Sequence, residues 1–214
     1  TYGVVYTTMF IDYSFYNSTN SAYYYPYFAA SNHAVGIVGW DDNYSRFNFT
    51  EVPPADGAFI IKNSWGTGFG EQGYFYVSYR DPKIGKYNFV FTGESPQNYD
   101  RIYQHDPLGW VGSFGGGTSH TEWGANMFTS NSSETLSAVS FYAVDTNTSY
   151  EIFIYKNPDN GPVNTTGYSY TQKGTISGPP GYYTKIISPG IVLQGNDTFS
   201  VVMNLTAQNT VWPL

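Results

Sequence analysis

The sequence predicts a mainly β protein built from two domains. Aromatic residues make up 20% of the 214 residues and charged residues 12%, and the chain holds 23 glycines and 12 prolines. Aromatic residues favour strands, whereas Gly and Pro favour turns, so this composition is typical of twisted sheets joined by ordered loops. Apolar periodicity fades into polar residues near positions 95–106, which indicates a join. We therefore predict a first domain over 1–94, a linker over 95–108 and a second domain over 109–214.

The first domain is predicted to be a meander of strands. Runs rich in β-branched and aromatic residues predict strands over Gly3–Phe10, His33–Trp40, Gly57–Gly66 and Gly73–Tyr79. Small and bulky apolar residues alternate in the second of these runs, which indicates a buried strand. The turn-forming residues of 41–43 end it.

The second domain is predicted to be a β-sandwich, because short β-type runs alternate with clusters of turn residues. These runs are Trp123–Thr129, Leu136–Val144, Ser149–Tyr155, Tyr183–Ile187 and Thr198–Leu205. Alternation within 134–142 predicts Leu136, either Ala138 or Val139, and Phe141 near the core.

Three motifs in the first domain carry the chemistry. Asn32-His33-Ala34-Val35 opens one predicted strand, Lys62-Asn63-Ser64-Trp65-Gly66 ends the next, and Gly70-Glu71-Gln72-Gly73-Tyr74 follows. In this order they resemble the His and Asn segments of papain-like cysteine peptidases. The resemblance covers about residues 1–85 and implies the C-terminal, β-barrel-like lobe of that fold. Each residue alone has a plainer interpretation as a surface His, a turn Asn or a core Trp, but the three motifs in register favour the peptidase.

The resemblance implies a role for four residues. His33 would be the general base and acid that activates a cysteine thiol and then protonates the leaving amine. Asn63 would hold the imidazole in one orientation, and Trp65 would cover the hydrogen bond between them. Ala34 would contact the substrate, because the residue after the His lines a substrate pocket in this family.

The chain departs from the family in one respect, since it contains no cysteine. The nucleophile and the Gln of the oxyanion hole are missing, and no Gly-x-Ser-x-Gly motif offers a serine instead. We expect a fragment of a cysteine endopeptidase, inactive alone, that hydrolyses peptide or protein substrates together with an N-terminal lobe carrying the Cys. The alternatives are a non-catalytic surface carbohydrate-binding or adhesion protein with a relic peptidase lobe, and a purely structural surface protein.

The second domain resembles the lectin-like β-sandwich that follows the papain-like domain in some prokaryotic, particularly archaeal, surface peptidases. Glycans are therefore candidate partners, because exposed aromatic rings can stack on sugar faces. The candidate contact residues are Trp110, Trp123, Tyr168, Tyr170, Tyr182 and Tyr183.

Charge and motifs limit the other partners. A net charge of −7 excludes nucleic acid and anionic membranes as main partners, and no apolar run approaches the roughly 20 residues of a membrane span. We expect no metal, since His105 and His120 lack partners at ligand spacing, and no cofactor. Asn-X-Ser/Thr sequons favour a secreted or cell-surface glycoprotein. They begin at Asn17, Asn43, Asn48, Asn131, Asn147, Asn164, Asn196 and Asn204.

Overall fold

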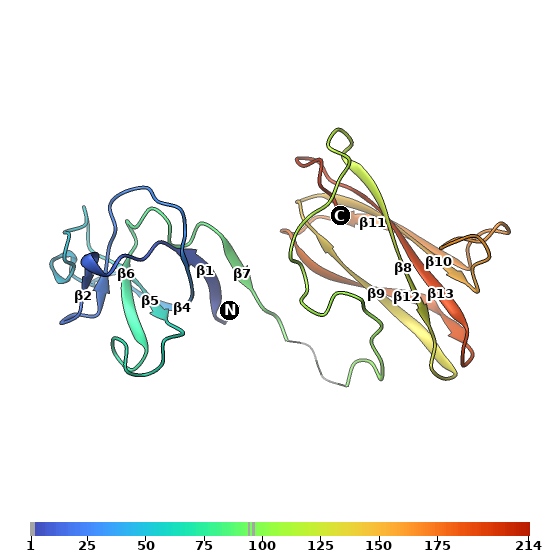
Figure 1. Ribbon diagram of the computed structural model, residues 1–214, viewed down its shortest axis with the longest axis horizontal. Coiled ribbons are helices and arrows are strands. Elements are labelled where there is room, and N and C mark those ends of the chain that lie inside the picture. Colours follow the sequence, from blue (N-terminus) through green and yellow to red (C-terminus); the bar gives the residue numbers. More distant parts are fainter. Residues whose placement is uncertain (1–2, 94, 96) are drawn as a thin grey trace. The chain divides into compact units, whose positions relative to one another are not determined.

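The computed structural model describes residues 3–93, 95 and 97–214 and separates two compact units, Thr1–Asn98 and Tyr99–Leu214. Apart from short 3-10 helices, the regular structure of the described residues is all β, which confirms the predicted fold class (Figure 1). Residues 1 and 94, the predicted ends of the first domain, and residue 96 of the predicted linker lie outside the described residues.

Within residues 3–93, the strands form one sheet of seven, in the order β2-β3-β6-β5-β4-β1-β7. The strands are β1 (Val5–Met9), β2 (Tyr16–Asn17), β3 (Ala22–Tyr23), β4 (His33–Asp41), β5 (Ala58–Lys62), β6 (Tyr74–Ser78) and β7 (Asn88–Val90). Neighbouring strands are antiparallel except β3 and β6, which are parallel. Short 3-10 helices at Tyr13–Phe15 and Arg46–Asn48 lie in the connections.

The core of the first unit lies against one face of this sheet. Its fully buried side chains come from β1, β3, β5 and β6, and include Met9, Tyr23, Ile61, Phe75 and Val77. A second cluster forms around Tyr24 and Phe49. Aromatic rings fill much of this space, which accounts for the aromatic-rich sequence of the unit.

Strand β4 is not the buried strand that its apolar alternation predicts. Val35 is buried and Ile37 packs against the core, but Trp40 is exposed. Because successive side chains of a strand point to opposite faces, Ala34 and Gly36 lie on the face away from this core. The small residues Ala34 and Gly36 therefore lie on a face of β4 that is open, not on a second packed face.

Among residues 97–214, the strands form a sandwich of two sheets (Figure 1). One sheet has the order β11-β10-β13-β8, from β8 (Thr121–Thr129), β10 (Thr148–Lys156), β11 (Tyr170–Ile176) and β13 (Thr198–Thr206). The other pairs β9 (Glu134–Ala143) with β12 (Gly181–Leu193). Both sheets contribute to one core, with Val139 and Phe141 from β9 facing Ile152, Ile154 and Leu205.

Two strands of the sandwich differ from the prediction. β11 was not predicted, because Gln172, Lys173 and Gly174 are poor strand formers; it is an edge strand paired with β10 alone among the described strands. β12 continues well past the predicted end at Ile187, with a register shift between Ile186 and Ile191. Leu136, Val139 and Phe141 lie in or against the core as predicted.

The Asp197 carboxylate joins the ends of three strands in the second unit. It accepts hydrogen bonds from the Gln194 backbone N–H after β12 at 2.6 Å and from Asn157 Nδ2 at 3.0 Å, and pairs with Lys156 Nζ at 2.9 Å. These donors, the Gln194 N–H first, lower the pKa of Asp197 to about 2.

We expect Asp197→Asn to destabilise the second unit in a pH-dependent way. Because the folded-state pKa lies below the unfolded value of about 3.9, the charged carboxylate stabilises the fold above about pH 4, and this stabilisation is lost as pH falls toward 2. In thermal unfolding, the wild type should have a higher melting temperature than the variant at pH 7. The difference between the two melting temperatures should disappear between pH 4 and pH 2. A difference independent of pH would contradict this. Asp106→Asn, at an exposed carboxylate of the same unit, is the control.

Candidate active site

The sheet brings His33 and Asn63 together from positions 30 residues apart. His33 is the first residue of β4, and Asn63 directly follows the last residue of β5, which runs antiparallel to β4. The two side chains therefore meet at the same end of the strand pair. His33 Nε2 lies 2.9 Å from Asn63 Oδ1. Asn63 is buried and His33 is half-buried, so one side of the imidazole is held and the rest is accessible.

A second hydrogen bond determines where the proton of neutral His33 resides. Asn63 Oδ1 also accepts the backbone N–H of Ser64 at 2.8 Å. Since a backbone N–H can only donate, the atom that it meets must be the amide oxygen. The same oxygen faces His33 Nε2, so the imidazole must donate from Nε2. Nδ1 of the neutral ring then carries no proton and is free to act as a base.

Aromatic rings enclose this pair. The Trp65 ring stacks on the imidazole with centroids 4.4 Å apart and an interplanar angle of 25°. Tyr13 stacks on Trp65 at 5.7 Å, and Phe69 meets it edge-on at 4.9 Å. The second sequence motif contains Trp65, and Phe69 directly precedes the third of these motifs. None of the motifs contains Tyr13, which comes from a separate 3-10 helix and carries no local signal.

The glycines of the third motif shape the loop behind Asn63. The Asn63 backbone N–H donates to the Gly73 carbonyl at 2.9 Å. Gly70 and Gly73 have φ values of +56° and +90°, and a Cβ on Gly70 would lie 2.1 Å from the Tyr74 carbonyl oxygen. Such positions favour glycine because other residues are strained there. The Gly-Glu-Gln-Gly-Tyr motif is thus required for the turn that holds Asn63.

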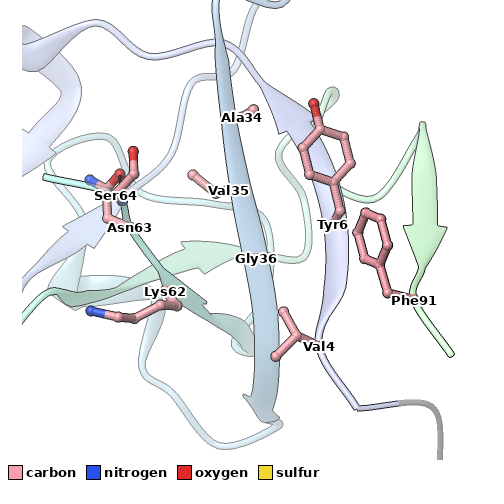
Figure 2. Close-up of a pocket in the computed structure, with 9 residues that line it drawn as sticks. All are labelled: Val4, Tyr6, Ala34, Val35, Gly36, Lys62, Asn63, Ser64 and Phe91. Atoms are coloured by element: carbon pink, nitrogen blue, oxygen red, sulfur yellow. Dashed lines mark hydrogen bonds between the residues drawn. The ribbon is translucent and has the colours of Figure 1, made fainter. Parts of the chain in front are cut away.

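Ala34 lines a hollow of about 340 Å³ on the open face of β4. Figure 2 shows Val4, Tyr6 and Phe91 on one side of β4 and Asn63 and Ser64 on the other. The hollow is largely apolar, and its lining residue Ala34 directly follows His33 in the sequence. Of its lining residues, the sequence predicted a contact role only for Ala34. The strand pattern of 3–10 places Val4 and Tyr6 on one face, but only the β1–β4 pairing, in which Tyr6 lies opposite Gly36, brings them to Ala34.

The six aromatic candidates for glycan contact do not form one cluster. Trp123 of β8 and Tyr168, which precedes β11, both contact Phe153 of β10. Tyr182 and Tyr183 belong to β12 in the other sheet, and Tyr170 and Tyr183 pack against the core. Trp110 lies before β8.

Among the described residues, no group of three or more His, Asp or Glu side chains could hold a metal ion, and no helix is long and apolar enough to cross a membrane. The arrangement at His33 can accept and return a proton at Nδ1 next to an apolar hollow. It has no thiol of its own, since the sequence lacks cysteine.

The fold and this site define a cysteine protease segment joined to a lectin-like domain. Residues 3–91 match the papain family cysteine protease model, and residues 102–214 match the lectin like domain model. The second match covers more than half of the chain. The chain therefore belongs to the lectin like domain family and carries, ahead of that domain, a segment that matches the papain family cysteine protease model.

Two solved structures are similar to this chain. One is the clostridial cysteine protease Cwp84 after propeptide cleavage, with a TM-score of 0.76, 27% sequence identity, and coverage of 96% of this chain and 50% of that chain. The other contains the cysteine protease and lectin-like domains of Cwp84, a surface layer associated protein of Clostridium difficile. It has a TM-score of 0.73, 27% identity, and coverage of 96% and 45%.

A curated relative, a cysteine protease of Blomia tropicalis, is 42% identical over 62 residues, which are 29% of this chain and 16% of that protein. The chain thus spans half or less of the proteins that it matches.

Proposed function

We propose that this chain supplies the histidine half of a cysteine peptidase active site and that a separate N-terminal lobe supplies the cysteine. The observation that carries this proposal is the hydrogen-bond chain from the Ser64 N–H through Asn63 Oδ1 to His33 Nε2. It leaves Nδ1 of the neutral His33 ring without a proton, so that this nitrogen is available as a base. A base held in one tautomer is what activation of a thiol requires.

In the proposed reaction, Nδ1 takes up and returns a proton once during formation of the thioester and once during its hydrolysis. Nδ1 takes the thiol proton, the thiolate attacks the peptide carbonyl carbon, and the resulting imidazolium returns the proton to the leaving amine nitrogen. A water molecule then gives a proton to Nδ1 and attacks the thioester, which releases the acid and restores the thiol. Asn63 keeps Nε2–H bound throughout, and Trp65 limits the access of water to that bond.

The hollow beside Ala34 would accept an apolar side chain of the peptide. Its lining by Val4, Tyr6 and Phe91 offers apolar surface near His33. Because apolar pockets favour apolar groups by burial, peptides with a bulky apolar residue next to the cleavage position would be preferred.

The proposed location is the cell surface or the extracellular space. The relative Cwp84 is a surface layer associated protein. Asn43 and Asn131 are exposed and would be accessible to glycosylation, whereas Asn204 lies within β13 with its Nδ2 directed to Glu151 Oε2 at 3.4 Å. Glycans on the exposed sequons are therefore expected, and none at Asn204.

The proposal is tested by mixing the full chain with the N-terminal lobe of its parent protein, made separately. We expect hydrolysis of a fluorogenic peptide by the mixture and by neither part alone, with loss of activity after alkylation of the thiol by iodoacetamide. Alkylation should also be faster at pH 6 in the mixture than in the free lobe, because the imidazole favours the thiolate. A folded complex that shows neither peptide hydrolysis nor faster alkylation of the thiol would contradict the proposal and favour a non-catalytic surface protein.

A further inference from the structure

The outer face of the four-stranded sheet carries a row of polar and aromatic side chains. Lys173, Glu151, Asn204 and Trp123 lie directly opposite one another across β11, β10, β13 and β8. Their strand neighbours Ile152, Leu205 and Met203 pack in or against the core. Since side chains alternate along a strand, the row faces away from the core of the sandwich.

A hollow of about 180 Å³ lies along this row. Ser149, Glu151, Asn204 and Thr206 line it, together with Tyr150, so carboxylate, amide and hydroxyl groups converge on a small volume. The Asn204 amide is incompletely bonded: Nδ2 makes a long contact of 3.4 Å to Glu151 Oε2, and Oδ1 is buried and has no partner among the described residues. Rotation about the last side-chain torsion, which is broad for Asn, can turn this amide toward a ligand.

An aromatic surface borders the hollow. Trp123 is 57% exposed, and its ring stacks on Phe153 with centroids 5.7 Å apart and an interplanar angle of 27°. Phe153 in turn contacts Tyr168 at 5.6 Å. Phe153 thus holds the Trp123 ring from one side while leaving much of its surface open to solvent.

We propose that this face binds a neutral glycan, with one sugar ring stacked on Trp123 and its hydroxyls bound by Glu151 and Asn204. A sugar presents an apolar C–H face and a rim of hydroxyls that both donate and accept, and this surface offers the complement of each. The Glu151 carboxylate accepts hydrogen bonds from sugar hydroxyls and repels the carboxylates of acidic sugars, which favours neutral ones. The site belongs entirely to the second unit and does not depend on the proposed peptidase function.

The test applies the full chain to an array of neutral hexose and N-acetylhexosamine oligosaccharides, with uronic-acid oligosaccharides for comparison. The best neutral oligosaccharide is then titrated by calorimetry into the wild type and three variants. Trp123→Ala and Glu151→Gln should each weaken binding by about tenfold or more, since each removes a central contact. Tyr182→Ala should leave binding unchanged, because Tyr182 has a similar exposure of 59% but lies on the other sheet.

Each outcome decides the proposal. Retention of tight binding by both Trp123→Ala and Glu151→Gln would overturn it, as would a preference for acidic sugars or the absence of any neutral ligand on the array. Loss of binding in Tyr182→Ala alone would also overturn the proposal, because it would show that the glycan binds to the two-stranded sheet. Glu151→Gln preserves the shape of the side chain, so its result holds even if Trp123→Ala lowers the stability of the unit. Saturable quenching of tryptophan fluorescence by the oligosaccharide, absent in Trp123→Ala, would report the stacking directly.

Discussion

His33→Ala is expected to lower kcat/KM of the proposed two-lobe peptidase by about 10³-fold or more. The substitution removes the imidazole that, in the proposed mechanism, takes the thiol proton and returns it to the leaving amine. General acid–base catalysis contributes about 10²–10⁴-fold on its own, and in the proposed mechanism the same ring also activates the nucleophile. Initial rates with a fluorogenic peptide measure the loss, and thermal unfolding checks that the half-buried position tolerates alanine.

His105→Ala is the matched control for this experiment. His105 also stacks on an aromatic ring, Phe128, at 4.7 Å, and its Nε2 lies 3.0 Å from the Met127 carbonyl oxygen, but it belongs to the second unit. Its replacement should leave the rate unchanged. Comparable activity of His33→Ala and the wild type would show that another group acts as the base.

Phe75→Ala is expected to destabilise the first unit by about 3–5 kcal/mol and to leave the stability of the second unit unchanged. Phe75 has 0% exposure in the centre of the first core, where its ring meets Phe69 at 5.5 Å and Tyr16 at 6.4 Å. Truncating a buried Phe costs about 3–5 kcal/mol, a large share of the roughly 5–15 kcal/mol that stabilises a domain. Hydrogen exchange should therefore show loss of protection in β4, β5 and β6 and retained protection in β10 and β13.

The control for Phe75 is Phe47→Ala, which removes the same side chain from a position that is 71% exposed. It should change the free energy of unfolding by about 0.5 kcal/mol or less. Loss of protection in both units after Phe75→Ala would mean that they unfold as one cooperative body, contrary to their separate cores.

The sequence predicted those features whose signals are local. The strands around the His and Asn motifs were predicted because β-branched and aromatic runs end at Gly-rich turns, and the predicted sandwich core residues Val139 and Phe141 are buried. His33 and Asn63 were identified by motif, and the antiparallel pairing of β4 with β5 puts them within hydrogen-bonding distance. Their catalytic roles stay predictions.

The features that the sequence did not predict depend on contacts between distant segments. The hollow beside Ala34 needs Val4 and Phe91, which reach it only through the pairing of β1 with β4 and β7. The polar row at Glu151 and Asn204 needs four strands in register, one of which, β11, has too weak a strand pattern to be recognised. The choice of pairing partner depends on packing between segments far apart in the chain, which a local pattern does not specify.

The bond from the Ser64 N–H to Asn63 Oδ1 joins adjacent residues, so it forms whenever this turn folds. The orientation of the amide is therefore fixed by local chain geometry, and the pairing of β4 with β5 brings His33 Nε2 to the same oxygen. A half-site of this kind is preorganised before its partner arrives. In the proposed assembly, the entropy of ordering the imidazole is already spent during folding, which leaves the docking energy of the two lobes to position the thiol.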